Sequence, residues 1–257
     1  MAERVIRVGS GPPLVWMHAA AGVGDNDPTV GALAARGFEV IAPVCPGFDD
    51  LADLDDIADV HDLALWYDDL FDSLGLEGVP VVGHSFGGMV AAELASHVPA
   101  RVSKLVLAAP LGLWRDDEQP ADMFPAFPLT IQELLWADPA NAPIPAPPTR
   151  NELAGDISGV DDPVLAMYLQ LVQGMTAVTK FIWPLPDKGL RKRLHRIKAP
   201  TLVVWGTKDR MVPPSYAEDF ARMLPDARVE LLDDAGHMVV LEKLDEFADL
   251  VAGFVRA

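Results

Sequence analysis

Cysteine is almost absent from this sequence, which has one, Cys45, in 257 residues. A single thiol cannot form a disulfide within the chain, so the cysteine usage gives no indication of an oxidising compartment. Cys45 stands between Val44 and Pro46, where we expect a small buried side chain.

Long hydrophobic runs are also missing. Every apolar stretch that approaches membrane-spanning length is interrupted by glycine, histidine or charge. The N-terminal segment Met1–Arg7 alternates charged and apolar residues and lacks the apolar centre of a secretory signal. The sequence therefore predicts a soluble cytoplasmic protein with no membrane partner.

Positive charge is scarce, because 20 Lys and Arg residues face 38 Asp and Glu residues for a formal net charge of -18. This balance disfavours nucleic acid and anionic membrane surfaces as partners. Acidic residues gather between positions 49 and 62, where Leu51, Leu54, Ile57 and Val60 have the spacing of one helix face. We interpret the carboxylates as the solvated side of that helix, and we predict neither a metal nor a cofactor.

Short β-rich runs alternate with helical patterns along the chain. This alternation predicts an α/β fold in which a mostly parallel sheet is covered by helices on both faces. The candidate strands are 4–8, 14–17, 39–42, 79–82, 105–107, 202–205 and 229–232. The candidate helices are 28–36, 54–74, 86–97, 215–223 and 244–255.

Residues 111–197 break the alternation. Their proline-rich stretch 138–148 can form neither a long helix nor a central strand. We interpret the segment as a helical lid (cap) over the carboxyl ends of the strands, where ligands of open α/β sheets bind. The chain would then consist of a core, residues 1–110 and 198–257, with the lid inserted between them.

A G-x-S-x-G segment, Gly83–Gly87, follows the candidate strand 79–82 and precedes the helix-prone stretch 88–95. The pentapeptide alone arises often by chance, but between a strand and a helix it predicts a nucleophile elbow centred on Ser85. The flanking glycines remove Cβ atoms that would collide where strand and helix approach each other. Ser85 is therefore the candidate nucleophile.

A serine hydroxyl needs a nearby base that takes its proton. His237 is the candidate base, because it lies between the last candidate strand and the last candidate helix and can reach over the sheet edge. His84 is expected to pack beneath the elbow, and His61 and His97 are expected to be ordinary helix residues.

The base in turn needs a carboxylate that orients it. Asp209 follows the strand and glycine turn of Thr201–Lys208, whereas Asp233 and Asp234 stand too close to His237 in sequence. The order Ser85, Asp209, His237 is the order expected for a nucleophile on such an elbow.

Two backbone N–H groups should stabilise the oxyanion that forms during the reaction. The N–H of Phe86, directly after the nucleophile, is one candidate. The small-residue loop after an early strand supplies the other, for which we favour Ala20 over Ala19. His18 is expected to anchor this loop by hydrogen bonding.

With these motifs the chain resembles the α/β-hydrolase superfamily over essentially its whole length. The matching segments are His18-Ala19-Ala20, Gly83–Gly88, Trp205–Asp209 and Ala235-Gly236-His237. The resemblance implies an eight-stranded, mostly parallel sheet with a lid after the sixth strand. One departure is Ala19, where the family usually has glycine, so this residue must avoid positive φ.

The resemblance implies a hydrolase that forms an acyl-enzyme, most readily a carboxylesterase on small to medium apolar esters. Family members that cleave carbon–carbon bonds in ring-fission products typically have tryptophan after the catalytic histidine and asparagine before the serine. Here these positions hold Met238 and His84, which disfavours that reaction. Epoxide hydrolases and haloalkane dehalogenases use aspartate in place of Ser85.

Three alternatives stay open. The first is a carbon–carbon bond hydrolase or lactonase that holds a substrate carboxylate with Arg150, Arg191 or Arg193; the second is a perhydrolase. The third, a non-catalytic ligand receptor, is disfavoured because all three members of the triad are present. In every case we expect a small-molecule ligand, in contact with residues around the elbow and on the lid: His18, Trp114, Trp136, Trp183 and Met238.

Overall fold

A computed structural model describes residues 4–126, 130–143, 163–183, 185 and 187–257 of the chain. The strands of these residues form one seven-stranded sheet in the order β1-β3-β2-β4-β5-β6-β7. Strand β1 (Val5–Gly9) pairs antiparallel with β3 (Glu39–Pro43), and every other pairing is parallel. The remaining strands are β2 (Pro13–Met17), β4 (Val79–His84), β5 (Val102–Ala108), β6 (Thr201–Gly206) and β7 (Ala227–Leu232).

The mostly parallel α/β sheet is confirmed, and each of the seven candidate strands corresponds to an observed one. The count of eight implied by the family resemblance differs from the seven described strands. Among the described strands, β1 at one edge of the sheet is the only antiparallel one. The inserted segment follows β5, the fifth described strand along the chain, and not a sixth strand as the resemblance implies.

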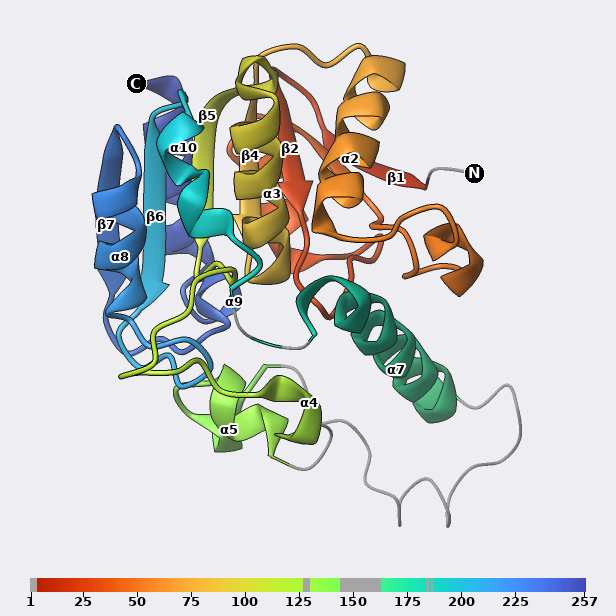
Figure 1. The fold of residues 1–257 in the computed structure, drawn as a ribbon, viewed down its shortest axis with the longest axis vertical. Coiled ribbons are helices and arrows are strands. Elements are labelled where there is room, and N and C mark those ends of the chain that lie inside the picture. Colours follow the sequence, from red (N-terminus) through yellow and green to blue (C-terminus); the bar gives the residue numbers. More distant parts are fainter. Residues whose placement is uncertain (1–3, 127–129, 144–162, 184, 186) are drawn as a thin grey trace.

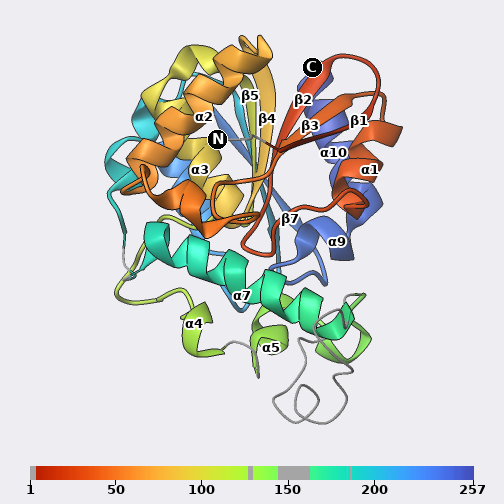
Figure 2. The same ribbon diagram turned by 90° about the vertical axis from the view of Figure 1, so that its right-hand side faces the viewer.

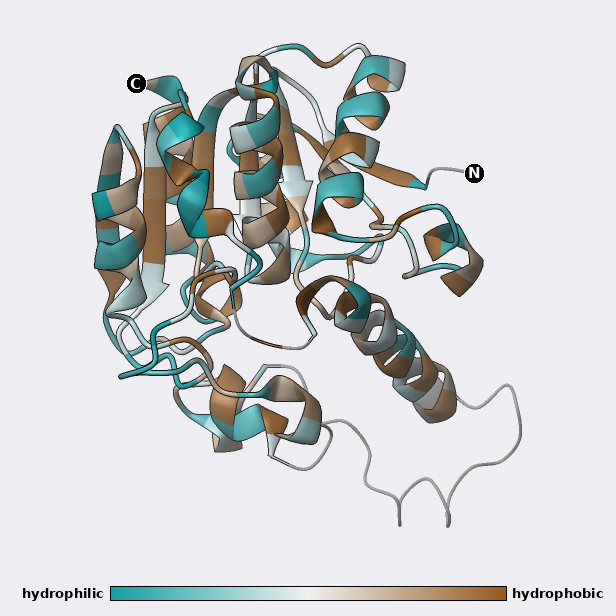
Figure 3. Cartoon of the chain, viewed as in Figure 1, coloured by the Kyte–Doolittle hydropathy of each residue, from teal (hydrophilic) through white to brown (hydrophobic). Residues whose placement is uncertain are grey.

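Helices cover both faces of the sheet (Figures 1 and 2). On one face lie α2 (Val60–Leu74) and α3 (Phe86–His97), and on the other α1 (Pro28–Ala35) and α10 (Leu244–Arg256). The central strands are buried from both sides, so they are almost entirely apolar. Strand β6 accordingly is brown along most of its length in Figure 3, whereas the covering helices alternate brown and teal. Two further helices, α8 (Tyr216–Met223) and α9 (Val239–Glu242), precede and follow β7.

The helix predicted for 54–74 is shorter than expected. A 3-10 turn covers Leu51–Leu54, and α2 begins only at Val60. The reason is Asp59, whose extended backbone (φ −150°) and side chain cap the helix by accepting hydrogen bonds from the N–H groups of His61 and Asp62. The acidic stretch is therefore two helical pieces joined by a short connection.

The segment 111–197, which the sequence predicts to be a cap, contains the described helices α4 (Met123–Ala126), α5 (Ile131–Leu135) and α7 (Pro163–Ile182). These three helices lie beyond the carboxyl ends of the strands (Figures 1 and 2), whereas the turns at the end of the segment pack against α3. Short 3-10 turns stand at Pro139–Asn141, Leu190–Lys192 and Leu194–Arg196, and another, Pro99–Arg101, precedes β5. The second half of the proline-rich stretch, residues 144–148, lies outside the described residues. Within the described residues, every helix is too short or too polar to cross a membrane.

Candidate active site

Ser85 stands at the turn between β4 and α3 in a strained conformation. Its φ of 53° and ψ of −115° lie in a region that residues with a Cβ rarely adopt. Such strain costs about 1–3 kcal/mol and persists only where the surroundings enforce it. Here the Ser85 N–H donates to the carbonyl of Ala108 (2.9 Å), and its carbonyl accepts from Met89 N and Leu111 N (3.1 Å each).

The two glycines of the elbow leave no room for side chains. A Cβ at Gly83 would lie 2.5 Å from the carbonyl oxygen of Gly87. A Cβ at Gly87 would overlap the carbonyl oxygens of Met17 and His18, at the end of β2. The close approach of β2, β4 and α3 thus depends on glycine at both positions, as the G-x-S-x-G pattern predicts.

The structure brings Ser85, His237 and Asp209 into one hydrogen-bonded row. The Oγ atom of Ser85 lies 2.8 Å from His237 Nε2, and His237 Nδ1 lies 2.8 Å from Asp209 Oδ2. The histidine and aspartate side chains are 3% and 0% exposed. With its Nδ1 proton donated to the carboxylate, the ring presents the Nε2 lone pair to the serine hydroxyl, so it can accept that proton.

Asp209 is held by four donors. Its Oδ1 atom accepts from the N–H groups of Met211 (2.8 Å) and Val212 (2.9 Å). Its Oδ2 atom accepts from Trp205 Nε1 (3.0 Å) in addition to His237. The carboxylate is therefore fixed in direction before any substrate binds, and it in turn fixes the imidazole ring.

His84 holds the backbone of His237 in place. Its Nε2 donates to the backbone carbonyl of His237 (2.9 Å), and the two rings lie 5.5 Å apart. Complete burial, reinforced by the neighbouring His237, lowers the pKa of His84 from 6.5 to about 3. The ring is therefore neutral at ordinary pH and holds the loop in place through its one N–H. The sequence predicted that His84 packs beneath the elbow, but not this bond.

The candidate oxyanion donors lie beside the serine. Phe86 is the first residue of α3, so its N–H has no carbonyl partner within the helix and lies at the positive end of the helix dipole. Ala19 and Ala20 border the same cavity as Ser85. Among the described residues other than glycine, positive φ occurs at Ser85, Ala109 and Asp234, so Ala19 avoids it as expected.

His18 shapes the oxyanion loop without reaching the cavity. Its Nδ1 donates to the carbonyl of Ala19 (2.8 Å), its Nε2 accepts from Cys45 N (3.0 Å), and its ring packs edge-on against Phe48. Burial lowers the pKa of His18 to about 4, which keeps the ring in the neutral form that this pair of bonds requires. The prediction that His18 anchors its loop fits these bonds. The expected substrate contact does not, because His18 does not border the cavity.

Ser85 and His237 open into a cavity between the core and the cap. Apart from these two and Gln132, its described lining is apolar, and it contains no cationic side chain. The larger apolar residues of the lining come from α4, from α5 and the residue that follows it, from α7 and from the two loops that carry Asp209 and His237: Met123, Ile131, Leu135, Trp136, Leu171, Met175, Met211 and Met238. Moving a neutral apolar group from water into such a cavity is favourable.

Of the predicted substrate contacts, Trp136 and Met238 border this cavity and two other tryptophans do not. Trp114 donates its Nε1 proton to Asp116 (2.9 Å) on the surface. Trp183 is 48% exposed and packs edge-on against Phe124. Both predictions rested on aromatic content, which does not indicate the direction in which a ring points.

The arginines considered as carboxylate ligands are also placed elsewhere. Arg193 pairs with the buried Glu93 (2.6 Å), and Arg191 is exposed near Asp187 (3.4 Å). Arg150 lies outside the described residues. No described arginine therefore serves the cavity.

Sequence reasoning missed Glu242, which joins the cap to the loop of the candidate base. Its Oε2 atom accepts from Gly236 N (2.6 Å) and its Oε1 atom from Ala137 N (2.9 Å). Beside it, Met238 N donates to the carbonyl of Leu135 (3.0 Å). The only sequence signal is a carboxylate shortly after the histidine, and its partner in the cap is invisible without the fold.

A seven-stranded, mostly parallel sheet with a serine on the strained turn after a central strand, under an inserted cap, defines the α/β-hydrolase class. Residues 9–250 match the Alpha/beta hydrolase family, and the chain belongs to it.

Several relatives show what the chain is similar to. The 2-hydroxy-6-oxo-6-phenylhexa-2,4-dienoate hydrolase of Burkholderia cepacia is 28% identical over 262 residues, which cover 96% of this chain and 88% of the relative. Among solved structures, the esterase from Exiguobacterium antarcticum has a TM-score of 0.76 at 22% identity, with 99% of this chain and 96% of that chain covered. The meta-cleavage product hydrolase of Pseudomonas fluorescens IP01 has a TM-score of 0.72 at 19% identity, with 99% and 94% covered. At these identities the structural likeness shows the fold alone.

Proposed function

We propose that this hydrolase cleaves carboxylic esters with an apolar acyl or alcohol group by way of an acyl-enzyme on Ser85. One observation carries the proposal: the hydrogen-bonded row Ser85–His237–Asp209 opens into a cavity whose described lining is apolar and uncharged. The row can supply the nucleophile, and the cavity suits a neutral apolar substrate.

In the first half of the reaction, Ser85 Oγ attacks the ester carbonyl while His237 Nε2 takes the hydroxyl proton. Asp209 stabilises the imidazolium that forms, and its own four hydrogen bonds keep it in place. The N–H groups of Phe86 and Ala20 stabilise the oxyanion, with Ala19 as the reserve for Ala20. His237 then protonates the departing alcohol.

In the second half, a water molecule takes the place of the alcohol. His237 removes a proton from that water, the hydroxide attacks the acyl carbonyl, and the same oxyanion donors act again. The proton then returns to Ser85 as the carboxylic acid leaves. The chain's own residues supply every proton transfer in this cycle.

A second candidate function is hydrolysis of a carbon–carbon bond in a 2-hydroxy-6-oxo-dienoate, the substrate class named for the relative from Burkholderia cepacia. Such a substrate carries a carboxylate, whose burial requires a compensating cation or several donors. Among the described residues the cavity lining offers no cation, and Met238 and His84 depart from the pattern of these hydrolases. We therefore rank ester hydrolysis first.

The two functions separate in one comparison of kcat/KM. We would assay p-nitrophenyl esters of two to twelve acyl carbons beside 2-hydroxy-6-oxo-6-phenylhexa-2,4-dienoate, with the same enzyme preparation. The proposal predicts a higher kcat/KM for at least one ester than for the dienoate, with an optimum at an apolar acyl chain. A higher kcat/KM for the dienoate would assign the chain to the second function.

The role of Ser85 is tested by a Ser85→Ala variant, with Ser103→Ala as the matched control at an exposed serine of β5. Ser85→Ala should lower kcat by at least about 1,000-fold, because only the oxyanion donors and binding remain. A fluorophosphonate should add one label per chain to the native protein and to Ser103→Ala, as seen by intact mass. Labelling or full turnover by folded Ser85→Ala would refute the assignment.

A further inference from the structure

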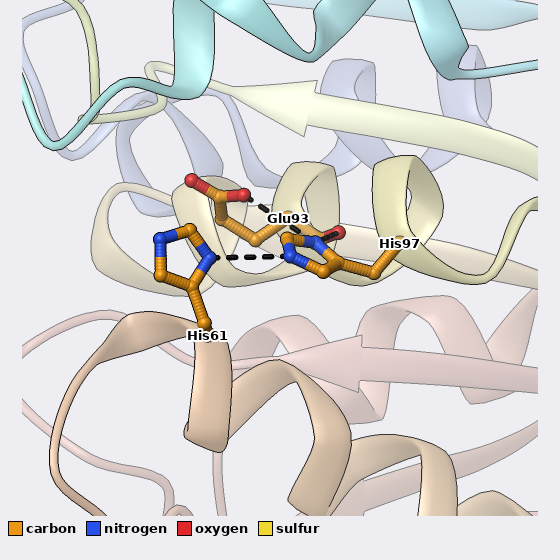
Figure 4. Close-up of side chains that lie close together, drawn as sticks. All are labelled: His61, Glu93 and His97. Carbon is orange, nitrogen blue, oxygen red and sulfur yellow. Dashed lines mark hydrogen bonds and ion pairs between the residues drawn. The ribbon is translucent and has the colours of Figure 1, made fainter.

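Three side chains with metal-ligating groups meet on the face of the sheet covered by α2 and α3. His61 is the second residue of α2, and Glu93 and His97 stand one turn apart at the end of α3. Figure 4 shows the two imidazole rings facing each other, with the Glu93 carboxylate beside the His97 ring. Each residue offers one ligand atom, and these atoms all lie within 4.8 Å of one another.

The hydrogen bonds of His97 determine which nitrogen it presents. Its Nδ1 donates to the carbonyl of Glu93 (2.8 Å), so in the neutral ring the lone pair is on Nε2. That lone pair faces His61 Nδ1 at 3.2 Å. A metal-binding histidine typically has its second nitrogen engaged with a backbone carbonyl in this way, because the bond fixes both tautomer and ring direction.

The spacing of the two nitrogens fits a zinc ion. Two imidazole nitrogens that are each bound to zinc at about 2.0–2.1 Å in tetrahedral geometry stand about 3.3 Å apart. The nitrogens of His61 and His97 are already at 3.2 Å. To bind the ion, His61 must take its other neutral tautomer, with the proton on Nε2, and both rings must turn so that their lone pairs point at the ion instead of at each other.

Glu93 supplies a carboxylate oxygen as the third ligand, although Arg193 offsets much of its charge. Its side chain is 1% exposed, its Oε2 atom lies 3.6 Å from His97 Nδ1, and Arg193 holds it through Nε (2.9 Å) and Nη2 (2.6 Å). Each carboxylate oxygen has two lone pairs, so a bond from Arg193 leaves one on each oxygen. The C-terminal end of α3, where His97 stands, adds the negative end of a helix dipole, which favours a cation.

We infer that His61, Glu93 and His97 bind one zinc ion, with water in the remaining position. The sequence predicted no metal and assigned the two histidines no role. The site is remote from the reaction, because the 12 residues of α3 that separate Ser85 from His97 span about 18 Å. The ion would therefore tie α2 to α3 and stabilise the fold without touching the substrate. His97 is 25% exposed, so zinc can enter from solvent.

Zinc binding is measured by calorimetry on the tag-free, chelator-treated chain, and the site is characterised by the visible spectrum of its Co²⁺ form. The native chain should bind one equivalent at micromolar concentration. His61→Gln and His97→Gln should each weaken binding at least about 100-fold, whereas His195→Gln, at an exposed histidine outside the cluster, should leave it unchanged. His237→Gln should also leave it unchanged, which excludes binding at the candidate base.

Thermal unfolding gives an independent readout, since a ligand of the folded state raises Tm. One equivalent of Zn²⁺ should raise the Tm of the native chain and of His195→Gln, but not that of His61→Gln. The metal-free Tm of His61→Gln shows that this variant folds. The inference is overturned if the native chain binds no equivalent of zinc at micromolar concentration, or if binding survives both His61→Gln and His97→Gln, or if His237→Gln abolishes it.

Discussion

Replacing His84 with asparagine should remove part of the acid sensitivity of this protein. The folded chain holds the pKa of His84 at about 3, whereas the unfolded chain holds it at the ordinary 6.5. Between these values the unfolded state binds a proton that the folded state excludes, so stability is lost as the pH falls below 6.5. Above 6.5 both states are neutral and the residue contributes no pH dependence.

The magnitude follows from this difference. Each pH unit below 6.5 costs about 1.4 kcal/mol until the folded-state pKa is approached. At pH 5 the loss from His84 alone is therefore about 2 kcal/mol, a large fraction of the stability of an ordinary domain. Asparagine does not titrate, so it removes this pH dependence. Its amide is too short to replace the bond from His84 Nε2 to the carbonyl of His237, but that loss is the same at both pH values and does not affect the comparison.

The assay is urea unfolding of the native chain and His84→Asn at pH 7.5 and pH 5.0, with His195→Gln as a matched control at an exposed histidine. The native chain and the control should lose about 2 kcal/mol more than His84→Asn between the two pH values. Carboxylates and His18 titrate equally in all three proteins, so their effects cancel in the comparison. Equal losses in native and His84→Asn proteins would refute the claim that His84 is neutral and buried.

Two further perturbations test the packing around the site. Gly87→Ala should lower the free energy of unfolding by about 3 kcal/mol or more, because its Cβ would overlap the carbonyl oxygens of Met17 and His18. The control is Gly253→Ala in α10, where nothing lies within 4 Å of the added Cβ. In the same urea titration it should be neutral or stabilising by up to about 1 kcal/mol. Glu242→Ala should lower kcat for the preferred ester about ten-fold or more with a smaller change in KM, because it frees the backbone beside His237. Glu246→Ala, at an exposed position, should leave both parameters unchanged. An equal effect of the two variants would show that the Glu242 contact does not position the histidine.

The parts of the site that the sequence could predict depend on local geometry. The chain must pass from a strand to a helix within a few residues around Ser85, which requires a sharp turn. The positive φ of Ser85 is the backbone conformation of that turn. The order of Asp209 and His237 along the chain, each after a strand of a parallel sheet, indicated that both loops lie at one edge. The structure places the two side chains within 2.8 Å of each other.

The parts that escaped prediction depend on contacts between distant segments. Nothing near Glu242 in sequence indicates that its carboxylate accepts from Ala137, since that contact requires the path of the cap. Trp114 and Trp183 were predicted to meet the substrate from their aromatic character alone, but side-chain direction is decided by the packing of each turn. Helix α2 begins at Val60, later than predicted, because Asp59 caps it. Several aspartates precede the helix, and their spacing does not indicate which of them is the cap.

The link between the cap and the histidine loop has a consequence for recombining these enzymes. Arg210, next to the candidate acid, donates hydrogen bonds to the backbone carbonyls of Glu133, Trp136 and Ala137. The N–H of Met238, next to the candidate base, donates to the carbonyl of Leu135. A chimera with a foreign cap inserted between the end of β5 and the start of β6 would replace these acceptors while keeping Arg210 and Met238. Donor caps should therefore be chosen for their backbone course at this short segment, ahead of any similarity in the helices that contact substrate.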